Sequence, residues 1–274
     1  MIRLGVVVAL AALAYTVLQA VFGGLLLSSA PALPGNATGL FLAANLLSAT
    51  TVVVLAARIA SRGWHRALVL FFVLWGIQAN NLVEAVFFSL DIPRAMLRLL
   101  FLDALCVSLV FAFVVDRLAP VPAVAGPSEP ASRTTGSWLA RIAACDIGYV
   151  VAYMTAGLLV WPFVQGFYLA RPMPDPRAVP VMAMFRGLVF TGIVGLLVRQ
   201  LAVRRMAVGL LVGATLSVIG GVVPLMVPNP YMPDAIRFPH MIEVGVSNFL
   251  WGLGAALLLS PGAGSPALSK AHAA

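Results

Sequence analysis

Charged side chains are scarce in this sequence of 274 residues, and acidic ones are the scarcest. Only 9% of the residues are charged, with 9 Asp or Glu against 17 Lys or Arg, whereas 62% are hydrophobic. A soluble domain carries about 25% charged residues, so this chain does not have enough of them to cover a water-facing surface. The composition excludes an ordinary soluble enzyme. It predicts an all-α, polytopic integral membrane protein whose main partner is the lipid bilayer.

Cysteine and histidine are also nearly absent, which limits the metal and redox chemistry open to the chain. Cys106 and Cys145 stand in different apolar segments without CxxC spacing, and we interpret them as buried thiols. A metal site made of His240, Glu243 and Glu84 would rest on a single histidine and is disfavoured. No haem-type histidine pair, GxSxG, HExxH or Walker motif occurs. We therefore expect no cofactor.

Apolar runs of helix length recur along the chain. About 20 apolar residues are needed to cross the hydrocarbon core of a bilayer, and by this criterion we predict about eight transmembrane helices. The expected ranges are 4–28, 39–60, 67–89, 95–116, 138–169, 179–199, 206–227 and 240–260.

Basic residues are distributed unevenly over the predicted loops. With a cytoplasmic N-terminus, eleven of the 17 Lys and Arg fall inside and five outside, while Arg186 lies within a span. This asymmetry follows the positive-inside rule and places both termini in the cytoplasm, with the protein in the cell (plasma or inner) membrane. Topology also explains most of the net charge of +8, so we expect no nucleic-acid partner.

A polar connection divides the predicted spans into two groups of four. Residues 118–137, LAPVPAVAGPSEPASRTTGS, are rich in Pro, Ala and Ser and have little to bury. We interpret this segment as a flexible cytoplasmic linker. It separates two four-helix halves, 1–117 and 138–262, and a cytoplasmic tail follows at 263–274.

The two halves share a weak internal similarity. A shift of 141 residues places Leu55–Arg58 on Leu196–Arg199 and Asn45 on Arg186. Since each half holds four spans, a duplication would produce parallel repeats about an axis along the membrane normal. Chance alignment of Leu-, Ala- and Val-rich helices explains the same few identities, so both interpretations stay open.

Intramembrane polar residues are concentrated in the outer half of the predicted spans. Asn80, Asn81 and Glu84 fall on one side of the third span, and His240 and Glu243 have i, i+3 spacing in the eighth. A charge at bilayer depth costs roughly 2.5–3.5 kcal/mol on insertion scales, so it usually marks a site, a pathway or a buried pair. The sequence predicts an outward-facing polar pocket between the halves, lined by Asn80, Asn81, Glu84, Arg186, His240, Glu243 and Asn248.

Two prolines interrupt spans at a similar depth. Pro162 in the fifth span frees the carbonyl of Leu158, and Pro224 in the seventh frees that of Gly220. Interrupted helices in matching parts of two halves are typical of transporter binding sites, although kinks also occur in ordinary membrane helices.

Three functions fit such a pocket. In the preferred one, Arg186 binds a small, anionic solute or ion, asparagines orient it, and Glu84 or Glu243 takes a coupling proton or cation. In the second, an intramembrane enzyme acts on an anionic or lipid-linked substrate at the outer leaflet, with His240 and Glu243 as base and orienting group. The third is a non-catalytic assembly or sensory subunit.

Each candidate residue also has a purely structural interpretation. The charged residues would form interhelical ion pairs, and the asparagines would form hydrogen bonds between helices. The arginines near span ends are predicted to reach lipid phosphates; these are Arg94, Arg171, Arg177 and Arg237.

Overall fold

The chain folds into a bundle of membrane-length helices. The computed structural model describes residues 2–27, 37–88, 92–120, 134–229 and 231–260. Within these ranges, eight helical stretches are long and apolar enough to cross a membrane, and no named strand occurs. The prediction of an all-α, multi-pass membrane protein is therefore confirmed.

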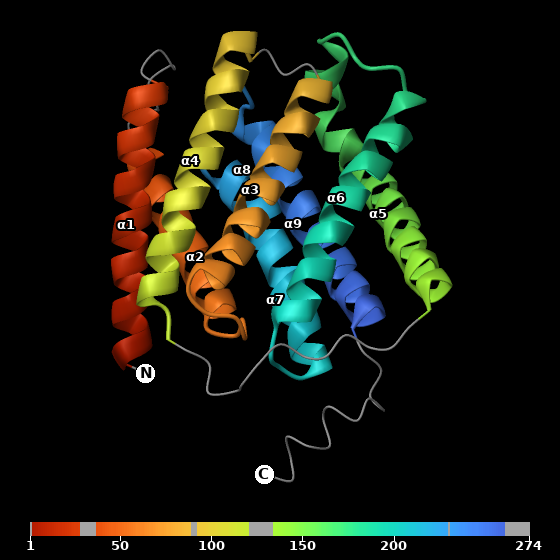
Figure 1. The fold of residues 1–274 in the computed structure, drawn as a ribbon. Coiled ribbons are helices and arrows are strands. Elements are labelled where there is room, and N and C mark those ends of the chain that lie inside the picture. The colour runs from red at the N-terminus through yellow and green to blue at the C-terminus, as the bar shows by residue number, and fades with distance from the viewer. Residues whose placement is uncertain (1, 28–36, 89–91, 121–133, 230, 261–274) are drawn as a thin grey trace.

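The helices follow the predicted apolar runs closely. The seventh span is built from α7, a π-helix η1 and α8, so nine α-helices are labelled among the described residues (Figure 1). The elements are α1 (Ile2–Leu26), α2 (Ala37–Ala56), α3 (Trp64–Phe87), α4 (Arg94–Leu118), α5 (Thr135–Leu169), α6 (Ala178–Gln200), α7 (Arg205–Ser217), η1 (Val218–Val222), α8 (Val223–Met226) and α9 (Asp234–Leu259).

Successive spans run in opposite directions through the bundle. In Figure 1, α1, α3, α5 and α7 begin at the lower end, and α2, α4, α6 and α9 begin at the upper end. We use "lower end" and "upper end" in this sense. The sequence prediction equates the lower end with the cytoplasm. Most of the predicted linker (residues 121–133) and the whole predicted tail lie outside the described residues.

Two helix boundaries differ from the prediction by four residues or more. The eighth span was expected to begin at 240, yet α9 begins at Asp234 and includes Pro239. A carboxylate in the first turn suits the positive end of a helix dipole. The second span was expected to reach residue 60, yet α2 ends at Ala56.

Residues 58–60 leave α2 to pair with the segment that follows α6. The Ala60 N–H donates to the Gln200 carbonyl (2.8 Å), and the Ala202 N–H donates to the Arg58 carbonyl (3.0 Å). Ile59 and Leu201 form the antiparallel bridge between these bonds. The pairing joins the ends of the two helices that the repeat hypothesis treats as equivalent.

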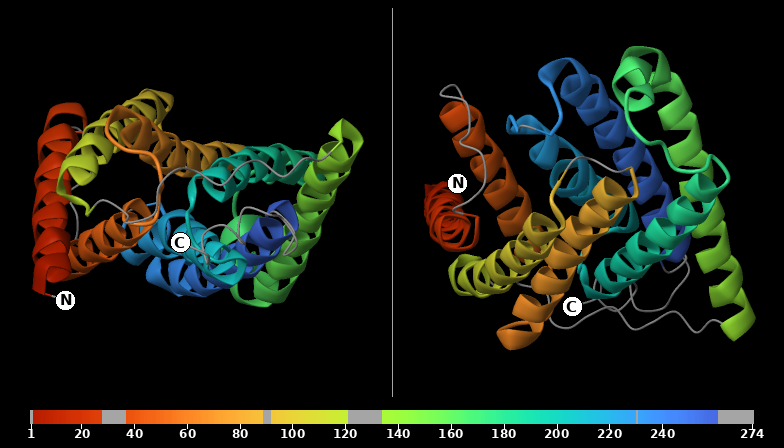
Figure 2. Two further views of the ribbon diagram at one scale, coloured as in Figure 1. Left: turned by 60° about the horizontal axis from the view of Figure 1, so that its bottom comes forward. Right: turned by 90° about the horizontal axis from the view of Figure 1, so that it is seen from above.

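The two halves pack in the same order. In the first, α1 contacts α2 and α4, and α3 contacts α4; in the second, α5 contacts α6 and α9, and α7 contacts α9. Across the halves, α3 packs on α6, while α2 packs on the span formed by α7, η1 and α8 (Figure 2). A parallel repeat predicts such matching contacts. The repeat itself stays a hypothesis.

Small residues allow α7 and α9 to approach closely. A Cβ atom on Gly213 would lie 2.7 Å from the Phe249 carbonyl oxygen, and one on Gly209 would lie 2.7 Å from a methyl of Leu253. Small side chains at helix contacts are the usual means of close packing in membranes. This close contact fixes the seventh span, which carries the irregular η1 segment, against α9.

A buried arginine ties α2, α3 and α4 together at the lower end. Arg66 is 2% exposed, and its Nε donates to Asp116 Oδ1 at 2.7 Å. Its Nη atoms donate to the backbone carbonyls of Ala56, Asp116, Ala119 and Pro120. Arg66 had been counted among the basic residues of the cytoplasmic side, but it is a buried structural residue.

Arg237 has a similar role at the upper end. It is 0% exposed, and Nη1 donates to the carbonyls of Leu225 (2.6 Å) and Met226 (2.8 Å) at the end of α8. Nη2 donates to Asp234 Oδ1 at 2.5 Å. The prediction that Arg237 reaches lipid phosphates is therefore wrong, because its guanidinium satisfies the free carbonyls at a helix C-terminus.

Candidate functional site

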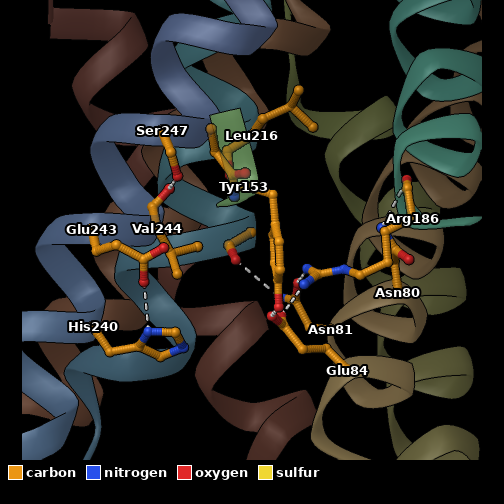
Figure 3. A network of polar contacts seen from close by, with 12 residues as sticks. Asn80, Asn81, Glu84, Tyr153, Arg186, Leu216, His240, Glu243, Val244 and Ser247 are labelled. Atoms are coloured by element: carbon orange, nitrogen blue, oxygen red, sulfur yellow. Dashed lines mark hydrogen bonds and ion pairs between the residues drawn. The ribbon is translucent and has the colours of Figure 1, made fainter. Parts of the chain in front are cut away.

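The polar face of α3 meets Arg186 of α6 inside the bundle. Arg186 is 1% exposed, and its Nη1 forms an ion pair with Glu84 Oε2 (Figure 3). Its Nη2 donates to Asn81 Oδ1 at 3.2 Å. Glu84 stands near the end of α3, and helical side chains tilt toward the helix N-terminus, which brings the carboxylate back into the bundle.

A third helix contributes to this ion pair through Tyr153. The Tyr153 hydroxyl of α5 donates to Glu84 Oε1 at 2.6 Å. The Arg186 guanidinium also lies 5.6 Å from the Tyr153 ring centroid and 5.7 Å from that of Phe190, within the range of cation–π attraction. One charge pair therefore holds α3, α5 and α6 together.

One of the predicted site residues, Asn81, binds the backbone carbonyl that Pro224 leaves free. Proline cannot donate to the carbonyl four residues earlier, and the Gly220 carbonyl instead accepts from Asn81 Nδ2 at 3.0 Å. The residues around Gly220 form the π-helix η1, a feature that is frequent at functional sites. Asn81 thus bridges Arg186 and the irregular segment of the seventh span.

Two further asparagines bind backbone carbonyls in the same region. Asn80 Nδ2 lies 3.4 Å from the Arg186 carbonyl oxygen, and Asn248 Nδ2 lies 3.5 Å from that of Leu216, just before η1. Both side chains are buried. Their contacts are those that the structural interpretation predicts for intramembrane asparagines.

His240 and Glu243 form a separate pair on α9. Nδ1 of His240 lies 2.6 Å from Oε2 of Glu243. Among the described residues, no hydrogen bond or ion pair joins this pair to Glu84 or Arg186 (Figure 3). The structure thus joins four predicted residues, Asn80, Asn81, Glu84 and Arg186, in one network. Asn248 binds the Leu216 carbonyl, and His240 and Glu243 pair with each other.

Several buried polar atoms at the site have no hydrogen-bond partner among the described residues. Arg186 uses Nη1 and Nη2, but its Nε–H donor is unpaired, and so is Asn80 Oδ1. Buried polar groups in folded proteins are nearly always paired, and an unmade bond costs about 1–3 kcal/mol. The guanidinium therefore keeps a donor available for another group.

One network member and one nearby acid, Tyr153 and Asp146 of α5, were not predicted from the sequence. Tyr153 is neutral and amphipathic, so no charge signalled it. Asp146 is an acid inside an apolar span, a signal that was present in the sequence, but it lies in the lower part of α5. Its position departs from the predicted concentration of polarity in the outer half of each span.

The arrangement suits anion binding more directly than metal binding. Within the described ranges, no group of three His, Cys, Asp or Glu residues is close enough to hold a metal ion. The buried guanidinium of Arg186, here paired with Glu84, has instead the planar fork of donors that binds carboxylate and phosphate groups.

Comparisons of the chain with known proteins found no match. No protein-family model, no curated protein and no solved structure matches the chain.

Proposed function

We propose that this multi-pass membrane protein binds a small anion at Arg186 and carries it across the membrane. The upper end is taken as the outer side, as the distribution of basic residues predicts. The preferred substrate class is a small anionic solute or ion, taken up together with a proton. The seven predicted site residues, Asn80, Asn81, Glu84, Arg186, His240, Glu243 and Asn248, are proposed to form or border its path.

The binding of the buried Arg186 guanidinium to side chains alone, with one donor unused among the described residues, is the observation that supports this proposal most strongly. A guanidinium has five N–H groups in a rigid fork that matches an anion bidentately. The two structural arginines bind mainly backbone carbonyls, four at Arg66 and two at Arg237, and the Nε of Arg237 is also unpaired within the described ranges. Arg186 instead binds two side chains, Glu84 and Asn81, which a solute can displace. At Arg186, Nε has no partner in the described part of the chain.

Glu84 supplies a mechanism for binding and release. Its carboxylate occupies the place that an incoming anion would take on Arg186. When a solute anion displaces Glu84, that carboxylate loses its counter-charge inside the bundle, where an unpaired charge is costly. Proton uptake by Glu84 removes this charge, so anion binding and proton binding become coupled.

Anion-dependent stabilisation tests the proposal. Purified protein in detergent is heated in chloride, nitrate, inorganic phosphate or sulfate at constant ionic strength. At least one anion is expected to raise the Tm in proportion to binding, and the same anion is expected to cross proteoliposomes. Arg186→Lys keeps a positive charge for Glu84 but loses the bidentate guanidinium. The apparent anion affinity, measured by thermal stabilisation and by flux, should therefore fall at least tenfold.

Arg98→Gln is the matched control, because Arg98 is exposed near the upper end of α4. This variant should respond to anions as the wild type does. If Arg186→Lys binds and transports every anion that the wild type does with equal affinity, the proposed role of Arg186 is wrong.

The His240–Glu243 pair favours a second candidate, an intramembrane enzyme. An imidazole beside a carboxylate is the usual arrangement of a base and its orienting group. An enzyme would form product in detergent, without separate compartments, and would lose activity in a His240→Gln variant. A transporter needs two compartments to show net flux. Co-purification with a fixed partner, with neither activity present, would favour the assembly or sensory subunit.

A further inference from the structure

Asp146 is a buried carboxylate for which the anion site has no use. It is 6% exposed in α5, and its Oδ1 has no hydrogen-bond partner among the described residues. Arg141, five residues earlier on the same helix, donates to the Leu258 carbonyl of α9 instead. An acid inside a membrane span without a counter-charge is expensive to keep and is a functional candidate by default.

The position of Asp146 connects it to Arg186. A Cβ atom on Gly187, the residue after Arg186, would lie 2.3 Å from Asp146 Oδ1 and 3.0 Å from Tyr149 Cβ. Asp146 and Tyr149 therefore pack directly on the α6 backbone at the level of the arginine. Only a glycine leaves room for this carboxylate.

Asp146, Tyr149 and Tyr153 share one face of α5. Their i, i+3, i+7 spacing places them along one stripe, and the ring centroids of Tyr149 and Tyr153 are 6.1 Å apart with the ring planes inclined by 27°. The stripe ends at Glu84, through the Tyr153 hydroxyl. At a rise of about 1.5 Å per residue, Asp146 lies about 10 Å below Tyr153 along the helix.

A proton fits this stripe better than a metal ion does. Hard cations such as Ca²⁺ take six to eight oxygen ligands, whereas the described surroundings of Asp146 hold no group of three acidic, histidine or cysteine residues. Tyrosine hydroxyls both donate and accept hydrogen bonds, so each can pass a proton on.

We infer that Asp146 is the inner proton-binding residue of a path that runs from Glu84 along Tyr153 and Tyr149 toward the lower end of the bundle. The inference rests on the proposed function, whose coupling ion it names. The Glu84 O–H bond breaks and an Asp146 O–H bond forms, with the tyrosine hydroxyls exchanging protons between them. Glu84 returns to its charged form and pairs with Arg186 again, and Asp146 later releases its proton at the lower end.

Proton uptake into proteoliposomes tests this path. An entrapped pH-sensitive dye reports protons while an inward gradient of chloride, nitrate, inorganic phosphate or sulfate is applied, and anion entry is followed in parallel. Wild-type protein is expected to take up protons with the transported anion. Asp146→Asn and Tyr149→Phe should each lower proton uptake at least tenfold, whereas Asp146→Glu should restore most of it.

Asp103→Asn is the matched control, because Asp103 of α4 also has a buried oxygen without a partner but lies in the other half. Its proton uptake should equal that of the wild type. Tyr149→Phe removes a single hydroxyl, so it decides the question if Asp146→Asn fails to fold.

The outcomes separate this inference from the proposed function. Proton uptake at the wild-type level in the Asp146→Asn variant overturns the inference. Anion entry without proton uptake in the wild-type protein also overturns it. Neither result argues against the anion site at Arg186. Absence of anion binding and of anion flux in the wild type would overturn the proposed function and this inference together.

Discussion

Arg186→Gln is expected to lower the free energy of unfolding by about 3–5 kcal/mol, because it leaves the partly buried Glu84 carboxylate without its counter-charge. Asn81 would also lose the donor that now binds its Oδ1. Reversible unfolding in mixed micelles measures the change. A loss within the range of ordinary surface substitutions, about 0.5 kcal/mol, would show that the ion pair contributes little.

A double-mutant cycle isolates the pair. Glu84→Gln alone should also be destabilising, since it leaves the guanidinium unpaired. The double variant Glu84→Gln with Arg186→Gln should be more stable than the sum of the single losses predicts, because no buried charge then stands alone. Strict additivity would contradict a direct coupling between the two residues.

Arg66→Met is expected to have the second large effect, about 3–5 kcal/mol, because it leaves Asp116 as an unpaired buried carboxylate. Four carbonyl groups at the ends of α2 and α4 would also lose a donor. The loss is predicted to affect stability alone: the fraction that remains folded should still show anion-dependent stabilisation.

Arg62→Met provides the comparison for this variant. Arg62 is exposed in the same connection between α2 and α3, and its replacement should leave the Tm almost unchanged. If folded Arg66→Met protein lost anion binding, Arg66 would not be a purely structural residue, and the assignment of anion binding to Arg186 alone would be contradicted.

The spans were predictable because the thickness of the membrane requires about 20 consecutive apolar residues in each spanning helix. Such stretches are visible in the local sequence, and each predicted range overlaps an observed helix. Proline chemistry is local as well. The free carbonyl of Gly220 followed from Pro224 alone, although the structure was needed to identify Asn81 as its partner.

Contacts made by long side chains were not predictable in this way. Arg66 and Arg237 stand near span ends, where basic residues usually meet water or lipid phosphates. Each instead binds carbonyls at the end of another helix. Composition cannot reveal such partners, because they are distant in sequence and lie on the backbone.

The candidate site was partly predictable for a similar reason. Charge at bilayer depth identified Glu84 and Arg186, which the structure joins. It also identified His240 and Glu243, which pair with each other rather than with the network. Tyr153 was missed because a tyrosine in a membrane helix is ordinary until its hydroxyl is seen to bind a carboxylate.

The anion affinity of Glu84→Gln decides whether Arg186 is an anion-binding site. If Glu84 holds the place of a solute anion on Arg186, its neutralisation should strengthen anion binding, while Arg186→Gln should abolish it. Titration of chloride, nitrate, inorganic phosphate and sulfate into the purified proteins should therefore rank affinity as Glu84→Gln above wild type above Arg186→Gln. Equal affinities in the three proteins, or no binding by any of them, would contradict an anion site at Arg186.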